Sequence, residues 1–123
     1  MIHSSGAPAE GTLVDANEDL RRAAHPHELD QDGRPTRVVF SYPDVSVDVA
    51  SFTPLEDSQR RFPTSHIAIY PCRFFCDCGH NPEHRPKPDN RAHAIIPGRL
   101  PKADQRAAIL QLKEIHPPLS SGA

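Results

Sequence analysis

Residues 71–84 have the sequence PCRFFCDCGHNPEH, which contains all three cysteines of the chain and two of its eight histidines. Thiolates and imidazoles are the side chains that bind zinc in most protein sites. Their concentration in one short segment predicts a metal site, with zinc as the expected ion. The odd number of cysteines also argues against a framework of disulfides. We therefore interpret the rest of the sequence around this segment.

The predicted zinc site is a tetrahedral Cys3His set. Its expected ligands are Cys72, Cys76, Cys78 and His80. Cys72 and Cys76 are separated by three residues, which is a common spacing for a pair of zinc ligands. In an extended chain, residues 76, 78 and 80 project to the same side, and Gly79 allows the backbone to fold round an ion. The fourth ligand has three alternative candidates, all of them histidines: His66, His84 and His93.

Two other interpretations of the cysteines stay open. The thiols can be unligated, because cysteine packs as a small apolar side chain and two phenylalanines lie beside it in the sequence. A reversible disulfide between Cys72 and Cys76 is the redox alternative, since closely spaced thiols can exchange. Residues 80–84 also match the letters of the H-x-x-E-H motif of zinc peptidases. Pro82 argues against that motif, because it prevents His80 and His84 from sharing one helical turn.

The pattern of apolar residues predicts an α+β fold with a small antiparallel sheet of three or four strands. The expected strands are residues 36–42, 45–52, 65–70 and a short fourth at 92–96. The first two flank Pro43-Asp44, a sequence that suits a tight turn, so we expect them to form a hairpin. Residues 102–115 carry an apolar stripe, which predicts one C-terminal helix that covers a face of the sheet.

The domain organisation follows from these elements. Residues 1–35 are mostly polar, and we predict a flexible or partner-ordered segment with one short helix between residues 15 and 24. Residues 36–117 are predicted to form a single α+β domain that contains the Cys/His loop 71–84. Residues 118–123 are predicted to be a tail.

Composition predicts a soluble protein with a thin core. Only 37% of the 123 residues are hydrophobic, and 14 prolines interrupt the chain. A metal crosslink or a partner surface would add stability that such a core lacks. The sequence contains no apolar run of membrane-spanning length, and its first residues lack the pattern of a secretory signal. We therefore expect a cytoplasmic protein that does not bind membranes.

Charge is unevenly distributed along the sequence. Residues 1–59 contain eleven acidic and four basic residues, whereas residues 60–106 contain nine basic and four acidic ones. A basic segment around a metal site is typical of proteins that bind phosphate or nucleic acid. The formal net charge is −2, however, and the sequence contains no known nucleic-acid-binding motif. We therefore favour a protein partner and keep nucleic acid as the alternative for residues 60–106.

These observations predict a non-enzymatic interaction module, in which a structural zinc site fixes a basic loop that contacts a protein partner. Four protein ligands leave zinc no open position for a substrate. A small metalloenzyme with three protein ligands and a water is the first alternative. A nucleic-acid-binding zinc module is the second. The sequence identifies neither the partner nor the oligomeric state.

Overall fold

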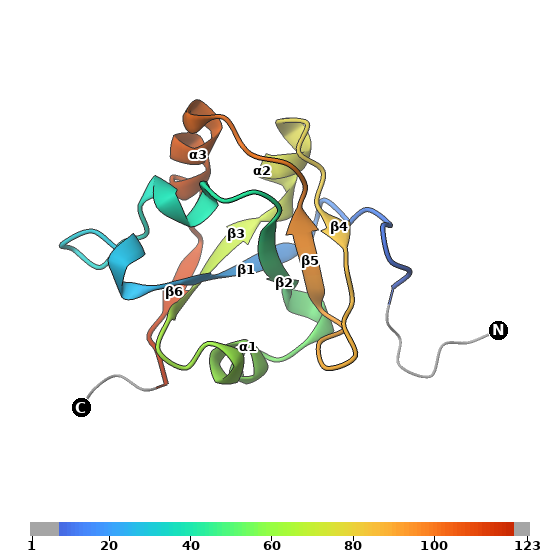
Figure 1. Cartoon of the computed structure of the whole chain (residues 1–123), viewed down its shortest axis with the longest axis horizontal. Helices are drawn as coiled ribbons and strands as arrows, with labels where there is room; N and C mark the ends of the chain where they lie inside the picture. Colours follow the sequence, from blue (N-terminus) through green and yellow to red (C-terminus); the bar gives the residue numbers. More distant parts are fainter. Residues whose placement is uncertain (1–7, 120–123) are drawn as a thin grey trace.

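The computed structural model describes residues 8–119, and within them six strands form one open antiparallel sheet (Figure 1). The order of the strands across the sheet is β4-β5-β2-β1-β3-β6. In chain order they are β1 (Asp19–Ala24), β2 (Val45–Val49), β3 (His66–Pro71), β4 (Glu83–His84), β5 (His93–Ile96) and β6 (Glu114–His116).

Three α-helices and three 3₁₀ helices complete the described chain. The α-helices are α1 (Leu55–Arg61), α2 (Cys72–Asp77) and α3 (Lys102–Ile109). The 3₁₀ helices are η1 (Pro26–Glu28), η2 (Arg37–Phe40) and η3 (Ala50–Phe52). Figure 1 shows α2 and α3 towards one end of the strands and α1 at the other end. None of the helices between residues 8 and 119 is long and apolar enough to cross a membrane.

The hydrophobic core lies between one face of the sheet and the elements η2, α2 and α3. Phe40 of η2 is fully buried and meets the ring of Tyr70 edge-on, with ring centroids 4.9 Å apart. Phe75 of α2 packs against Phe40 at 5.3 Å. Aromatic pairs in such tilted arrangements stabilise a core beyond their simple burial. These rings therefore fix η2 and α2 on the sheet.

The predicted α+β class and the antiparallel sheet are confirmed, but the predicted number of strands is wrong. Strands β2, β3 and β5 lie inside the predicted segments 45–52, 65–70 and 92–96, apart from one residue at the end of β3. The sheet has six strands rather than three or four. Two of the additional strands, β4 and β6, have only two and three residues. Such short segments carry too little alternation to be recognised in a sequence.

The strand predicted for residues 36–42 is wrong, and so is its hairpin with residues 45–52. Residues 37–40 form η2, which inserts Val39 and Phe40 into the core. Strand β2 pairs with β1 and β5 instead. The turn at Asp44 contacts Gly98, whose backbone N–H donates to the Asp44 carboxylate at 2.8 Å. Burial of two large side chains therefore outweighs the local strand preference of this segment.

The short helix predicted between residues 15 and 24 is also wrong, because Asp19–Ala24 forms β1 in the interior of the sheet. Strand β1 pairs with β3 at six positions, from Asp19 opposite Pro71 to Ala24 opposite His66. The sheet therefore takes strands from both sides of the domain boundary predicted near residue 36. Leu, Arg and Ala favour helices, but pairing on both edges of the strand overrides that weak preference.

The C-terminal helix is confirmed but is shorter than predicted. Helix α3 ends at Ile109, whereas the prediction extended it to residue 115. Residues 114–116 instead form β6 on the free edge of β3, and the N–H of Lys113 donates to the carbonyl of Ile69 at 2.8 Å. The apolar residue Ile115 thus packs against the core from a strand.

Candidate functional site

The segment 71–84 starts as a helix and not as the extended loop assumed from the sequence. Residues 72–77 form α2, so Cys72 and Cys76 are one helical turn apart and share a face. Their Sγ atoms are 3.8 Å apart, and both thiols are free. The extended chain that would align residues 76, 78 and 80 is therefore not present. Cys78 follows the last residue of α2 and does not belong to this helical pair.

Cys72 is fully buried and protonated at neutral pH. Burial is the main cause that raises the pKa of its thiol, and the neighbouring Cys76 raises the pKa further. Its Sγ lies 4.0 Å from the carbonyl oxygen of Val14. A thiol must lose its proton to act as a nucleophile or to bind metal. Cys72 would therefore have to lose this proton before it could bind metal or act as a nucleophile.

Cys78 and His80 lie beyond the C-terminal end of α2. Cys78 is exposed, and partial burial together with the carboxylates of Asp104 and Asp77 raises the pKa of its thiol. His80 contacts α3, where its Nε2 lies 2.9 Å from Oδ2 of Asp104. The pair links the end of the Cys/His segment to the helix α3.

The alternative histidine ligands are distributed over the sheet. His84 of β4 is buried and stacks on the ring of Phe52, with centroids 5.3 Å apart. His93 of β5 lies between the carbonyl of Arg85 and the hydroxyl of Ser46. His66 belongs to β3. In the described part of the chain, no three His, Cys, Asp or Glu side chains form a group that could hold a metal ion. Of the four predicted ligands, only Cys72 and Cys76 are in contact.

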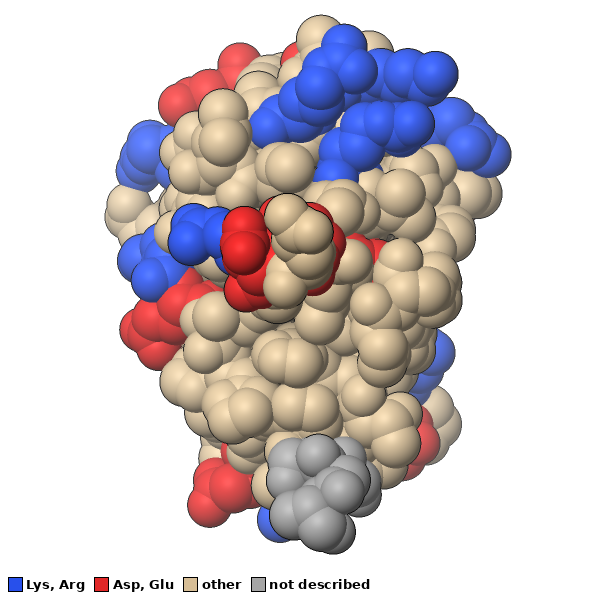
Figure 2. Space-filling view, turned by 90° about the vertical axis from the view of Figure 1, so that its left-hand side faces the viewer, with Lys and Arg blue, Asp and Glu red and all other residues tan. Residues whose placement is uncertain are grey.

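A second feature is a surface of four cations on η2, α3 and the segment between β5 and α3, which we call the basic face. Its members come from elements that contact one another: Arg37 of η2, Arg99 before α3, and Lys102 and Arg106 of α3. Figure 2 shows Lys and Arg side chains gathered towards the upper end of the side of the molecule seen there. Arg37 donates through Nη1 to Oε1 of Gln105 at 2.8 Å, and Arg99 donates to the carbonyl of Ser41 at 2.9 Å. Within residues 8–119 none of the four forms an ion pair.

A third feature is a buried carboxylate, Asp48, on the opposite face of the sheet. Its Oδ2 accepts hydrogen bonds from Ser58 at 2.6 Å and Arg61 at 3.0 Å, and its Oδ1 accepts one from Asn90 at 2.8 Å. Two of these donors, Ser58 and Arg61, belong to α1, which covers this carboxylate. The sequence alone does not indicate the hydrogen bonds to Asp48, because it does not indicate α1, which supplies two of the donors.

No family model, curated protein or solved structure matches this chain at a significant level. The fold and these features define a small α+β protein with an unneutralised basic face, a dithiol helix and a polar network on the far side of the sheet.

Proposed function

We propose that the protein is a non-enzymatic interaction module whose basic face binds an acidic segment of a protein partner. The observation that carries this proposal is the charge of the basic face. Four cations lie on adjacent elements, and none of them forms an ion pair with a carboxylate of the described residues. Ordinary surface charges tend to be interspersed with opposite ones. A cluster of one sign is a feature of surfaces that attract a charged partner.

Two arginines of the basic face are held in position by internal hydrogen bonds, without a bound partner. Arg37 and Arg99 each use one N–H group for an internal acceptor, which holds the side chain in place. A guanidinium has five N–H donors, so each of these arginines retains donors for a carboxylate. Ordering the side chains in advance lowers the entropy cost of binding. Glutamate and aspartate side chains match the fork of the guanidinium.

Zinc at Cys72, Cys76, Cys78 and His80 is the second part of the proposal. Two thiolates bound to one tetrahedral zinc at about 2.3 Å lie about 3.8 Å apart, and this separation supports the Cys72–Cys76 pair as half of a site. The contact between His80 and Asp104 resembles the carboxylate–histidine pairs that surround zinc ligands. Binding would have to deprotonate Cys72 and draw Cys78 and His80 towards the pair.

The two parts of the proposal are connected through α3. Asp104 lies on the same helix as Lys102 and Arg106, which belong to the basic face. A zinc ion bound by His80 would restrain Asp104 and therefore the position of this helix. In this role zinc is structural, with four protein ligands and no open position for a substrate. A cobalt-substituted sample with three protein ligands and a water would favour the metalloenzyme alternative instead.

Binding to defined anionic probes tests the basic face. The probes are a glutamate-rich peptide and a single-stranded oligonucleotide, each titrated at several salt concentrations. The double variant Lys102→Glu/Arg106→Glu should weaken binding of the peptide by about tenfold or more, because it replaces attraction by repulsion. The matched control Arg60→Glu/Arg73→Glu makes the same change in charge on α1 and α2 and should have little effect.

Two outcomes would contradict the proposal. Equal loss of peptide binding in both double variants would show that net charge, and not this face, controls binding. Tighter binding of the oligonucleotide than of the peptide, with a steep dependence on salt, would identify nucleic acid as the partner.

Metal analysis of protein purified without oxygen tests the zinc site. We expect one zinc per chain, and we expect Cys76→Ser to lose the metal and to unfold at a lower temperature, because metal binding and folding are coupled in such sites. Protein without metal, or a Cys76→Ser variant that retains it, would contradict this part. The peptide titration is independent of that result, so the two parts of the proposal can fail separately.

A further inference from the structure

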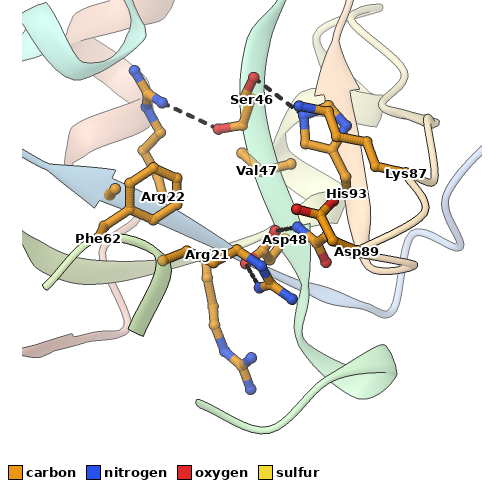
Figure 3. A pocket seen from close by; sticks show the side chains of 12 residues that line it. Arg21, Arg22, Ser46, Val47, Asp48, Phe62, Lys87, Asp89 and His93 are labelled. Carbon is orange, nitrogen blue, oxygen red and sulfur yellow. Dashed lines mark hydrogen bonds and ion pairs between the residues drawn. The ribbon is translucent and has the colours of Figure 1, made fainter. Parts of the chain in front are cut away.

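A cavity of about 380 Å³ opens on the face of the sheet opposite the core, next to α1 (Figure 3). Ser46 and Asp48 line it and alternate in β2 with the core residues, while His93 pairs with Asp48 from β5. Phe62, which follows α1, contributes an aromatic ring to the wall. The volume is in the range of sites for small molecules. The cavity shares no lining residue with the basic face or with the Cys/His segment.

The cavity exists because β1 and β2 separate after a short paired region. The two strands pair only at Leu20 with Val49 and at Arg21 with Asp48. Beyond that point the side chain of Arg22 bridges the gap, donating from Nε to the carbonyl of Val39 at 2.9 Å and from Nη1 to the carbonyl of Ser46 at 3.2 Å. The carbonyls of Val39 and Ser46 are therefore satisfied without a ligand.

Positive charge is in excess around the cavity. The lining cations are Arg21, Arg22, Arg61 and Lys87, whereas Asp48 and Asp89 are the lining carboxylates. Asp48 already accepts three hydrogen bonds, so it has little capacity for a cationic ligand. His93 adds no charge at neutral pH, because burial lowers its pKa.

Two cations retain donors for a ligand. Arg61 uses only Nη1, for Asp48, so its Nε and Nη2 have no hydrogen-bond partner in the described chain. Lys87 is exposed at the cavity and makes no side-chain contact with residues 8–119 that would occupy its ammonium. Arg21 is different, since its guanidinium is turned towards the carbonyls of Thr53 and Ala50.

We propose that this cavity binds a small organic anion with an apolar body the size of a ring. Arg61 and Lys87 hold the anionic group, and the ring of Phe62 contacts the apolar body. The hydroxyl of Ser46 and the imidazole of His93 are 3.3 Å apart and offer further hydrogen bonds. A fixed guanidinium and a mobile ammonium together suit a carboxylate or a phosphate.

The test is a nuclear magnetic resonance titration of the full chain with benzoate and with phenyl phosphate at millimolar concentration. Benzamide, which has the same ring but no charge, is the matched control. At least one anion should shift amide resonances of residues 46–48 and 87–93, and benzamide should bind about tenfold more weakly. Lys87→Glu should weaken binding of that anion by at least about fivefold without lowering the melting temperature, because Lys87 is exposed and has no partner to lose.

The control variant Lys102→Glu makes the same change in charge on the basic face and should leave the titration unchanged. Three results would overturn the proposal: no response to either anion, equal responses to benzoate and benzamide, or shifts that centre on η2 and α3. The peptide titration of the basic face is unaffected by any of them.

Discussion

The side chain of Arg22 forms hydrogen bonds at the point where β1 and β2 no longer pair. Its guanidinium donates to two backbone carbonyls, those of Val39 and Ser46, at the point where β1 and β2 separate. It also lies over the ring of Tyr42, 5.6 Å from the centroid. Burial lowers the pKa of Arg22, but a guanidinium keeps its charge at any physiological pH. The residue therefore satisfies one carbonyl of η2 and one of β2 beside the end of the paired region.

The variant Arg22→Met should lower the free energy of unfolding by about 2 kcal/mol, because hydrogen bonds from a charged donor to two carbonyls, one of them partly buried, are lost. Urea unfolding measures this change directly. Arg22→Lys keeps the charge but offers one donor group instead of a fork, so it should recover only part of the loss. Equal stability of the Met variant and the natural chain would show that water satisfies these carbonyls as well.

His84 makes the stability of the protein depend on pH. Burial lowers the pKa of its imidazole, and its Nδ1 is buried without a hydrogen-bond partner. Below the ordinary histidine pKa of about 6.5, the unfolded chain binds a proton that the folded chain resists. Stability is therefore fully present above that pH and is lost as the pH falls further.

Replacing His84 by phenylalanine tests this dependence. His84→Phe keeps a ring against Phe52 and removes the titrating group, so unfolding free energies measured by urea should fall less steeply between pH 7 and pH 5 than those of the natural chain. Burial also lowers the pKa of His93, which is unchanged in the variant, so part of the pH dependence of the unfolding free energy should persist. An identical slope in both proteins would assign the pH dependence to other groups.

At the scale of elements, β1 is the strand on which the sheet depends. It pairs with β3 at six positions and with β2 at two, and Leu20 and Ala24 are buried in the core. A fragment that starts at Thr36 lacks this strand. We expect the fragment 36–123 to show no cooperative thermal unfolding in circular dichroism, because β2 and β3 would lose their common neighbour. A folded fragment would instead support the domain boundary predicted from the sequence.

Strands β2 and β1 show which elements the sequence could predict and which it could not. The alternation in Val45–Val49 is strong because one face is buried, and it identified β2 correctly. Strand β1 has the sequence DLRRAA, in which Arg21 and Arg22 interrupt the alternation. Both arginines are partly buried and bond to backbone carbonyls, so their positions depend on partners distant in the sequence. A local sequence pattern does not indicate such long-range hydrogen bonds.

The sequence also indicated only part of the candidate site, because some of its contacts join residues that are distant in the chain. The spacing of Cys72 and Cys76 correctly placed two thiols together, although by a helical turn instead of an extended loop. The contact of His80 with Asp104 joins residues 24 apart in the sequence and could not be foreseen. Whether these residues bind zinc stays a prediction. The sequence did not indicate the basic face either. Arg37 lies in the acidic half of the sequence and contacts Gln105 only in the folded chain.

At the scale of the whole molecule, the sheet separates two charged regions. The basic face lies on elements that cover the core side, and the anion cavity lies on the other side. The strands between them, β1 and β2, are paired on both edges, whereas the edge strands β4 and β6 have two and three residues. Short edge strands offer little surface for pairing with other chains.

This arrangement predicts a gradient of local stability that hydrogen exchange can measure. Amides of β1 and β3 should exchange most slowly, because they lie in the longest paired region and Ala68 and Tyr70 between them are buried. Amides of β6 should exchange faster, since β6 has one neighbour, three paired positions and an exposed Glu114. Opening of an edge strand does not require global unfolding, so its exchange should depend only weakly on low concentrations of denaturant. Equal protection of β6 and β1 would mean instead that the sheet opens only as a single unit, and the edge would then be as stable as the centre.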